Sequence, residues 1–187
     1  MRISKAQAEK NRTRVVESAA VMFRQRGFEG AAVSDLMKAA GFTHGGFYNH
    51  FPAKESLLEE ALASAWKQMA AERGRAKNLQ QLVSGYLSRA TRQAPGSSCP
   101  AAALAGDVSR QPQSVKVVFA EGLEEMIDSL QARLSRGSKA AQRELAVSLA
   151  ARLVGALLLS RAVPDEHHLA HELLDATLRN ALREAGS

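Results

Sequence analysis

Apolar residues recur every three or four positions along most of this 187-residue chain, which is the period of an amphipathic α-helix. The first such pattern has Val16, Ala19, Ala20 and Phe23 on one face and ends at Gly27. The periodicity predicts an all-α protein. We expect a short helix after Thr43 and longer ones over about residues 5–26, 33–40, 54–73, 78–93, 100–110, 112–136, 138–162 and 165–184.

A glycine-rich polar stretch interrupts this pattern after residue 40. The preceding helix ends at Gly41, a residue suited to a left-handed turn, and Thr43 can cap the next helix, whose only large apolar residue is Phe47. Two glycines inside so short a helix cost roughly 1 kcal/mol each relative to alanine, so close approach to another surface favours them. The pattern predicts a helix-turn-helix with a DNA recognition helix. A small helical hairpin with a solvated face is the alternative.

The residues around Phe47 divide by the part of DNA that their side chains suit. Small and hydrogen-bonding side chains on the exposed face can contact base edges in the major groove, and tyrosine, histidine and lysine suit phosphates. We therefore expect Thr43, His44, Gly46 and Asn49 to contact bases and Tyr48, His50 and Lys54 to contact phosphates, with Gly45 in the same DNA-binding set.

The same residues carry a family resemblance. Gly45, Tyr48, His50, Phe51 and Lys54, followed by Glu55, resemble the signature of the TetR family of bacterial transcriptional regulators. The resemblance is dense over about residues 10–60. It implies a dimeric, usually repressing DNA-binding protein, with a helix-turn-helix domain over residues 1–52 and a helical ligand-binding and dimerisation domain over 53–187. Ala31-Ala32 departs from the family pattern, in which a Thr or Ser often caps the second helix and can contact a phosphate.

Charge supports nucleic-acid binding by the N-terminal part. Residues 1–54 hold nine Lys or Arg against four acids, a net charge of +5, while residues 55–187 hold sixteen against fifteen, a net charge of +1. A basic excess beside the helix-turn-helix favours DNA binding through phosphates. The basic residues at the start of the first helix could reach the DNA backbone, or they form a solvated arm: Arg2, Lys5, Lys10, Arg12 and Arg14.

Cellular location is predicted from what the sequence lacks. A single cysteine, Cys99, allows no internal disulfide, and no apolar run reaches the roughly 18 residues of a membrane span. The N-terminus does not continue into a signal-peptide apolar region. We expect a cytoplasmic protein with no membrane partner.

The C-terminal part contains large apolar and sulfur-containing residues that could line the cavity for an unknown small-molecule inducer. Most such residues in proteins are ordinary core, which is the alternative here. Cys99, placed before Pro100 at a helix start, is either a reactive sensor thiol at the positive end of a helix dipole or a buried small hydrophobe. The candidates for the ligand pocket are Trp66, Met69, Tyr86, Cys99, Phe119 and Met126.

The last two predicted helices have more apolar surface than one core can use. Leu145, Leu149, Leu153 and Leu157 form one stripe, and a second stripe follows Val147, Ala151, Val154 and Leu158. The final helix adds a matching stripe of Leu174, Leu178, Ala181 and Leu182. We interpret the segment 138–184 as the interface of a homodimer, a four-helix bundle across a two-fold axis.

Two other functions compete with this interpretation. His167 and His171, one helical turn apart beside Asp165 and Glu166, have a spacing compatible with a metal-dependent enzyme or a metal sensor. A polar helix start explains the same residues without a metal. The third class is an architectural DNA binder without a ligand. We expect a regulator that is not an enzyme, with no catalytic residues, no metal ligands and no cofactor.

Overall fold

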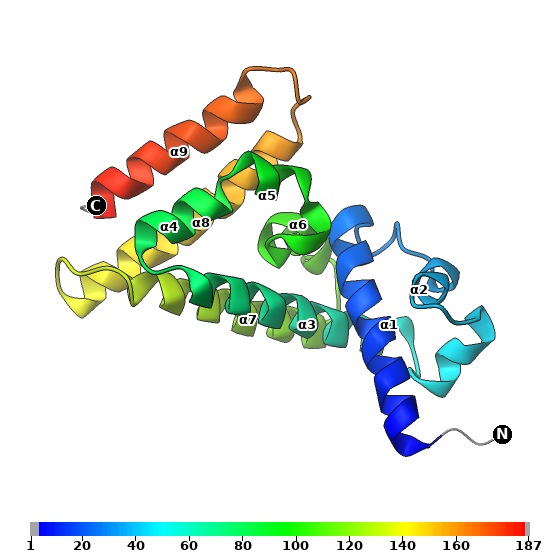
Figure 1. Ribbon diagram of the computed structural model, residues 1–187. Helices are drawn as coiled ribbons and strands as arrows, with labels where there is room; N and C mark the ends of the chain where they lie inside the picture. The colour runs from blue at the N-terminus through cyan, green and yellow to red at the C-terminus, as the bar shows by residue number, and fades with distance from the viewer. Residues whose placement is uncertain (1–3, 186–187) are drawn as a thin grey trace.

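The computed structural model describes residues 4–185, and within that range the protein contains helices and no strands. This confirms the predicted all-α fold. Figure 1 shows the N-terminal helices at one end of the molecule and α9 at the other. The elements are α1 (Lys5–Arg26), α2 (Val33–Ala39), the 3₁₀-helix η1 (His44–Asn49), α3 (Lys54–Arg75), α4 (Leu79–Tyr86), α5 (Arg89–Gln93), the 3₁₀-helix η2 (Pro95–Ser97), α6 (Pro100–Val108), α7 (Gln113–Gln131), α8 (Lys139–Arg161) and α9 (Leu169–Ala185).

Aromatic side chains form the core of the N-terminal part. Phe23 meets Phe28 edge-to-face at 5.3 Å, and Phe47 stacks on Phe51 at 5.6 Å. All four are fully buried. Gly27 and Gly41 have φ angles of +73° and +81°, so each ends its helix in the left-handed region that favours glycine. The turn at Gly27 sets the direction in which the chain leaves α1, and the turn at Gly41 sets the direction in which it leaves α2 toward η1.

Helix α3 connects the two parts of the chain, because it packs against both α1 and α7. Trp66 of α3 lies against α7, where its ring meets Phe119 edge-to-face at 5.7 Å. A Cβ atom added to Gly122 would lie 2.2 Å from the Trp66 ring. The close contact between these helices therefore depends on the absence of a side chain at residue 122.

The two apolar stripes predicted on α8 have different environments. Leu149, Leu153 and Leu157 are fully buried in the core, whereas Val147 and Leu158 are 44% and 48% exposed. Helix α9 packs along α8 and also contacts α4, and this buries Leu174 and Ala181 within the chain. The free apolar surface at this end of the molecule therefore belongs mainly to α8.

Several predicted boundaries were wrong. The helix expected over 78–93 is divided into α4 and α5, because Ser88 caps a new helix by accepting from the Thr91 amide. Helix α3 continues through Gly74. The two helices expected to end at residue 136 and to begin at 165 instead end at Gln131 and begin at Leu169. In the described part of the chain, no helix is long and apolar enough to cross a membrane.

Candidate DNA interface and ligand cavity

The predicted recognition element is a 3₁₀-helix of six residues, η1. Phe47 holds it to the core, and Tyr48 beside it is 72% exposed. With one buried anchor and two adjacent glycines, the sequence gives an α-helix little stabilisation here, and short 3₁₀ segments are common where an α-helix cannot continue. The predicted base-contacting and phosphate-contacting residues that are exposed are Thr43, His44, Gly45, Tyr48 and Asn49.

The remaining predicted contact residues are partly covered. Gly46 lies over the methyl group of Met37, which would be 3.5 Å from an added Cβ, and His50 is half-buried. The Lys54 ammonium donates a hydrogen bond to the Phe28 carbonyl oxygen at 2.7 Å. Lys54 thus ties the start of α3 to the loop before α2. Thr43 occupies the N-cap position of η1 but its side chain makes no capping hydrogen bond.

The arginines near the start of α1 contact the protein itself. Arg12 forms a two-pronged ion pair with Glu60 of α3, and its guanidinium lies over the Phe51 ring, 4.4 Å from the centroid. The hydrogen bonds to Glu60 are the main reason that the pKa of Arg12 is raised. Arg14 lies over the Phe42 ring at 5.1 Å. Arg12 therefore helps to fix α1 on α3, and Arg2 lies outside the described residues.

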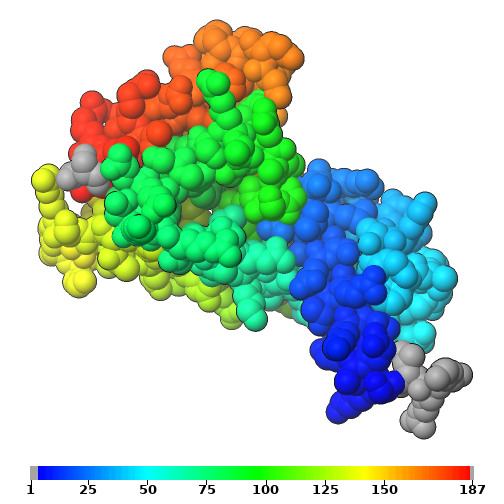
Figure 2. All heavy atoms as spheres, in the orientation of Figure 1, coloured from blue at the N-terminus to red at the C-terminus, as the bar shows by residue number. Residues whose placement is uncertain are grey.

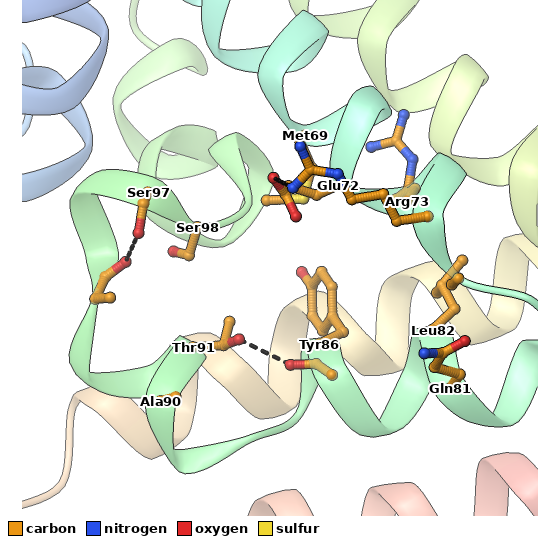
Figure 3. Close-up of a pocket in the computed structure, with 14 residues that line it drawn as sticks. Met69, Glu72, Arg73, Gln81, Leu82, Tyr86, Ala90, Thr91, Ser97 and Ser98 are labelled. Carbon is orange, nitrogen blue, oxygen red and sulfur yellow. Dashed lines mark hydrogen bonds and ion pairs between the residues drawn. The ribbon is translucent and has the colours of Figure 1, made fainter.

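A cavity of about 600 Å³ opens between the end of α3, helices α4 and α5, and η2. Figure 3 shows the Tyr86 hydroxyl pointing into this space, with Met69 and Ser98 on the opposite side. The volume is within the range of small-molecule sites. The lining residues are Met69, Glu72, Arg73, Arg75, Ala76, Gln81, Leu82, Gly85, Tyr86, Ala90, Thr91, Ala94, Ser97 and Ser98.

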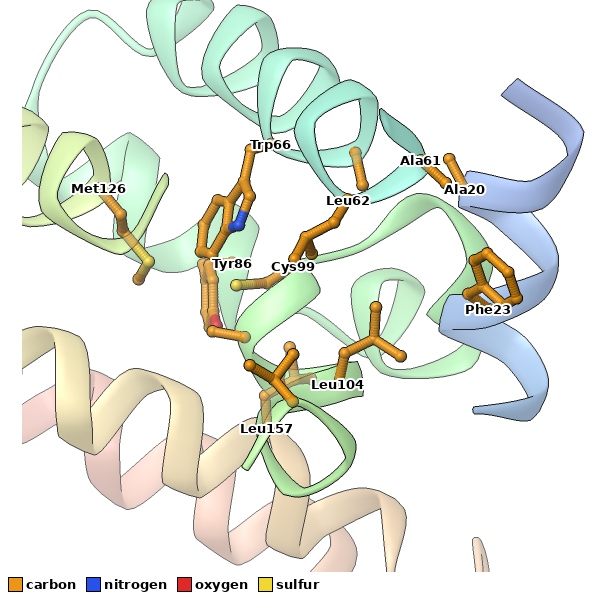
Figure 4. Packing of buried hydrophobic residues seen from close by; sticks show 14 of the residues in the cluster. Ala20, Phe23, Ala61, Leu62, Trp66, Tyr86, Cys99, Leu104, Met126 and Leu157 are labelled. Carbon is orange, nitrogen blue, oxygen red and sulfur yellow. The ribbon is translucent and has the colours of Figure 1, made fainter. Parts of the chain in front are cut away.

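Two of the six predicted pocket residues line this cavity, Met69 and Tyr86. The other four are not on its wall. Trp66, Cys99 and Met126 are buried in the adjacent core, where Figure 4 shows the Cys99 sulfur facing Trp66 and Tyr86. Phe119 packs on Trp66 from α7. These four side chains pack between helices, and for this reason they do not face the cavity.

Cys99 occupies the N-cap position of α6, as its place before Pro100 predicts. Its side chain makes no capping hydrogen bond and is 0% exposed. The arrangement matches the buried small hydrophobe better than the exposed reactive thiol, since reactive thiols occupy partly exposed positions.

Polar side chains at the cavity have unfilled hydrogen-bonding capacity. Within residues 4–185, the Tyr86 hydroxyl and the Arg73 Nε and Nη1 atoms are buried without a hydrogen-bond partner. Arg161, behind the wall, has an unpartnered Nη1. Burial lowers the pKa of Arg73 and of Arg161, and it raises the pKa of Tyr86 well above 10. At neutral pH the phenol is therefore a neutral donor.

One segment of the cavity wall is bonded to α1, in the N-terminal part. The Arg24 guanidinium of α1 donates to the Ser98 carbonyl oxygen at 3.1 Å, and Arg161 donates to the Ser98 hydroxyl at 2.5 Å. A Cβ atom added to Gly96 would lie 2.9 Å from a methyl carbon of Val21, so η2 and α1 are in close contact. Asp107 of α6 adds a second connection by accepting from the Phe28 amide at 3.0 Å.

Sequence patterns did not identify the arginines at these sites. Arg73 follows Trp66 and Met69 on the inner side of α3, so a charged residue on an apolar stripe was the available signal. Arg24, next to Phe23 on α1, gave no such signal, because its acceptors at Ser98 and Gln68 are far away in sequence.

The histidines considered as metal ligands do not share a helix face. Helix α9 begins at Leu169, so His167 lies in the preceding turn, where its ring stacks on His168 at 4.6 Å. His171 is within the helix. The predicted one-turn spacing on a single helix was therefore wrong. Nowhere in the described part of the chain do three or more His, Cys, Asp or Glu side chains gather as metal ligands would.

The fold and its exposed polar recognition element define a helix-turn-helix DNA-binding regulator. Residues 15–61 match the family model described as bacterial regulatory proteins, tetR family. The chain is 31% identical over 183 residues to the uncharacterized HTH-type transcriptional regulator Rv0196 of Mycobacterium tuberculosis, covering 91% of this chain and 93% of that protein. The chain belongs to the TetR family of transcriptional regulators.

Solved structures confirm the fold over the whole chain. A TetR-family transcriptional regulator from Cytophaga hutchinsonii superposes with a TM-score of 0.78 at 18% identity, covering 100% of this chain and 97% of that one. AibR, solved in complex with isovaleryl coenzyme A and operator DNA, superposes with a TM-score of 0.60 at 17% identity, covering 90% and 96%. Figure 2 shows the surface of this arrangement, with the N-terminal part at one end.

Proposed function

We propose that this TetR-family regulator is a homodimeric repressor that a small molecule releases from a roughly palindromic operator. The observation that carries the proposal is the bonding of Ser98, a residue of the cavity wall, to Arg24 of the DNA-binding part. A molecule that moves the wall therefore acts directly on α1. That AibR is found with both a ligand and operator DNA supports the same division of roles.

In this proposal, η1 enters the major groove. Thr43, His44 and Asn49 contact base edges, and the flexible backbone at Gly45 and Gly46 allows close approach. Tyr48 and His50 contact phosphates on either side, and Lys54 joins them if it leaves its bond to the Phe28 carbonyl. A repressor of this kind blocks transcription by occupying its operator.

The dimer forms through the segment 138–184. Helix α8 supplies the apolar surface that the monomer leaves free, at Val147, Ala151 and Leu158. Two copies related by a two-fold axis would place two η1 elements on one side of the DNA, and this arrangement predicts a palindromic operator with half-sites about one helical turn or a multiple apart.

Release requires that ligand and operator favour different dimer geometries. A hundredfold loss of operator affinity corresponds to a coupling free energy of about 2.7 kcal/mol, which is within the usual range for allostery. By linkage, operator DNA must weaken ligand binding by the same factor. A compound that binds equally well with and without operator is therefore not the inducer.

Selection of bound DNA from a random pool tests the first half of this proposal. We expect one enriched, roughly palindromic sequence bound by two chains. Asn49→Ala should relax the preference at one position in each half-site, and Tyr48→Ala should weaken binding to all sequences. A monomer bound to sites without symmetry would contradict the proposal. Release of the selected DNA by small molecules then tests the second half.

A further inference from the structure

The unpartnered groups at the cavity have a common chemical character. The Tyr86 hydroxyl and the Arg73 guanidinium are hydrogen-bond donors, Arg73 carries a positive charge, and each side chain is more than nine-tenths buried. Buried donors without acceptors are rare in folded proteins, because each loses its bonds to water without replacement. A ligand that supplies acceptors removes this cost.

The charge around Tyr86 is not balanced by nearby acids. Arg73 and Arg161 both interact with Tyr86, from α3 and α8, and neither forms an ion pair with any carboxylate in residues 4–185. Glu125 of α7 interacts with Arg73 only at longer range and is exposed. Neither arginine therefore has a counter-charge paired with it among the described residues. A buried charge without a counter-charge is strongly unfavourable.

The one acid among the lining residues does not fill this role. Glu72 pairs with Arg75 at 2.5 Å, one turn apart on α3, and both side chains are more than half exposed. Glu72 is therefore neutralised at the rim. With Glu72 and Arg75 cancelling each other, the lining residues keep one positive charge, that of Arg73.

The rest of the wall is uncharged and mostly apolar, and its polar residues are Gln81, Thr91, Ser97 and Ser98. Met69, Leu82, Ala90 and Ala94 face the cavity from α3, α4, α5 and the turn before η2. A cavity with an uncharged, mostly apolar wall and one cationic side chain favours an amphipathic molecule with an apolar body and one anionic group.

We propose that the ligand of this cavity is a monoanionic amphipathic molecule, of the class of carboxylates with an apolar body, whose head group accepts hydrogen bonds from Arg73 and Tyr86. This rests on the proposed ligand-controlled function and names its ligand class. The head group also lies beside Arg161, which donates to the Ser98 hydroxyl. If Arg161 moves toward the anion, it moves Ser98, whose carbonyl oxygen accepts a hydrogen bond from Arg24 of α1.

Binding of matched probes tests the ligand class. Octanoate and 4-phenylbutyrate are compared with octanamide and 4-phenylbutanamide, which keep the body and lose the charge, and with octylamine, which reverses it. The fluorescence of Trp66, the single tryptophan, or calorimetry reports binding. We expect both acids to bind at least about tenfold more tightly than their amides, because bonds to charged groups are the stronger ones. If neither acid binds at millimolar concentration, or if the amides or the amine bind as well, the proposal is wrong.

Variants locate the head group. Arg73→Gln and Tyr86→Phe should each weaken binding of the acids about tenfold or more and weaken binding of the amides less, because an amide oxygen accepts weaker hydrogen bonds than a carboxylate. Arg75→Gln, on the same helix at the rim, is the matched control and should change little. An equal loss with Arg75→Gln would place the anion at the rim and overturn the assignment.

The melting temperature of the free protein separates a binding role from a structural one. Arg73→Met removes an unpaired buried charge, so it should melt at the same temperature as the unaltered protein or higher. A clearly lower melting temperature with unchanged binding of the acids would make Arg73 a structural residue and contradict the proposal.

Operator release is measured with the same probes. Release by an amide or the amine with no effect of the acids would overturn the ligand class while preserving ligand control. Arg73-dependent binding of the acids without release would confirm the ligand class and contradict ligand control.

Discussion

Two buried arginines, one at the junction of α1 and η2 and one at the cavity, have opposite surroundings. Arg24, at the junction of α1 and η2, is 4% exposed and each of its three guanidinium nitrogens donates a hydrogen bond, to Ala20, Gln68 and Ser98. Arg73, at the cavity, is 7% exposed and neither its Nε nor its Nη1 has a partner. The same residue type at similar burial is thus fully bonded in one region and unbonded in the other.

The comparison separates an arginine that stabilises the fold, Arg24, from one whose donors are available to a ligand, Arg73. Burial lowers the pKa of Arg24 to about 10, so Arg24 stays charged at neutral pH and is held by neutral acceptors. Its bonds join two parts of the chain. The Arg73 Nε and Nη1 donors make no hydrogen bond within the described residues, and local features that do not favour stability are typical of functional sites.

The largest expected effect is at the junction. Arg24→Met should lower the free energy of unfolding by about 2–4 kcal/mol, because the buried Ser98 carbonyl loses its charged donor and Gln68 loses its partner. Denaturant unfolding monitored by circular dichroism measures the change. Arg73→Met is the matched substitution at the cavity, and an equal loss for both would end the distinction between the two regions.

A second comparison concerns the room for an added methyl group, at Gly96 in η2 and at Gly85 in α4. Gly96→Ala should lower the unfolding free energy by about 1–3 kcal/mol, since the new methyl group would meet Val21 and Gln25 of α1 at less than 3.0 Å. It should also alter operator affinity by shifting α1. Thermal unfolding and operator titration measure the two effects. No change in either would mean that η2 and α1 are not tightly packed.

Lys54 tests whether a residue that bonds within the N-terminal part can also contact DNA. If its ammonium exchanges the Phe28 carbonyl for a phosphate, Lys54→Ala should weaken binding to all sequences similarly and reduce the salt slope of binding by about one. Titrations of specific and random duplexes at several salt concentrations measure this slope. An unchanged slope with lower stability would limit Lys54 to its bond with Phe28.

The smallest expected effect is on the cavity side. Gly85 of α4 lines the cavity and an added Cβ would meet nothing within 4 Å. Gly85→Ala should therefore raise the unfolding free energy by roughly 0.5–1 kcal/mol through its greater helix propensity. Unfolding curves of Gly85→Ala and Gly96→Ala, recorded together, measure the difference in unfolding free energy between the two sites. A loss of stability in Gly85→Ala would show that there is no free space beside Gly85.

The sequence was sufficient to predict the helical fold and the short helix after Thr43, because both depend on local signals. Periodicity located α1 and α8, and Gly41 and Phe47 marked the turn and its anchor. The cavity depends on contacts between distant residues. Trp66 and Met126 are residue types common in binding sites, but both pack in the core. Arg73 became a candidate ligand-binding residue only when the structure showed that its donors have no partner. The 3₁₀ form of η1 also escaped prediction, because two glycines leave the helix type to tertiary packing.

The bond between Arg24 and Ser98 has a consequence for how such a regulator can diversify. Arg24 binds a backbone carbonyl oxygen, which every amino acid provides, so the connection does not depend on which side chain residue 98 carries. Side chains that line the cavity, such as Leu82 or Thr91, can change during evolution without breaking that connection. In the proposed mechanism, new ligand specificities can thus arise by substitution in the wall while the hydrogen bond that links the wall to α1 is retained.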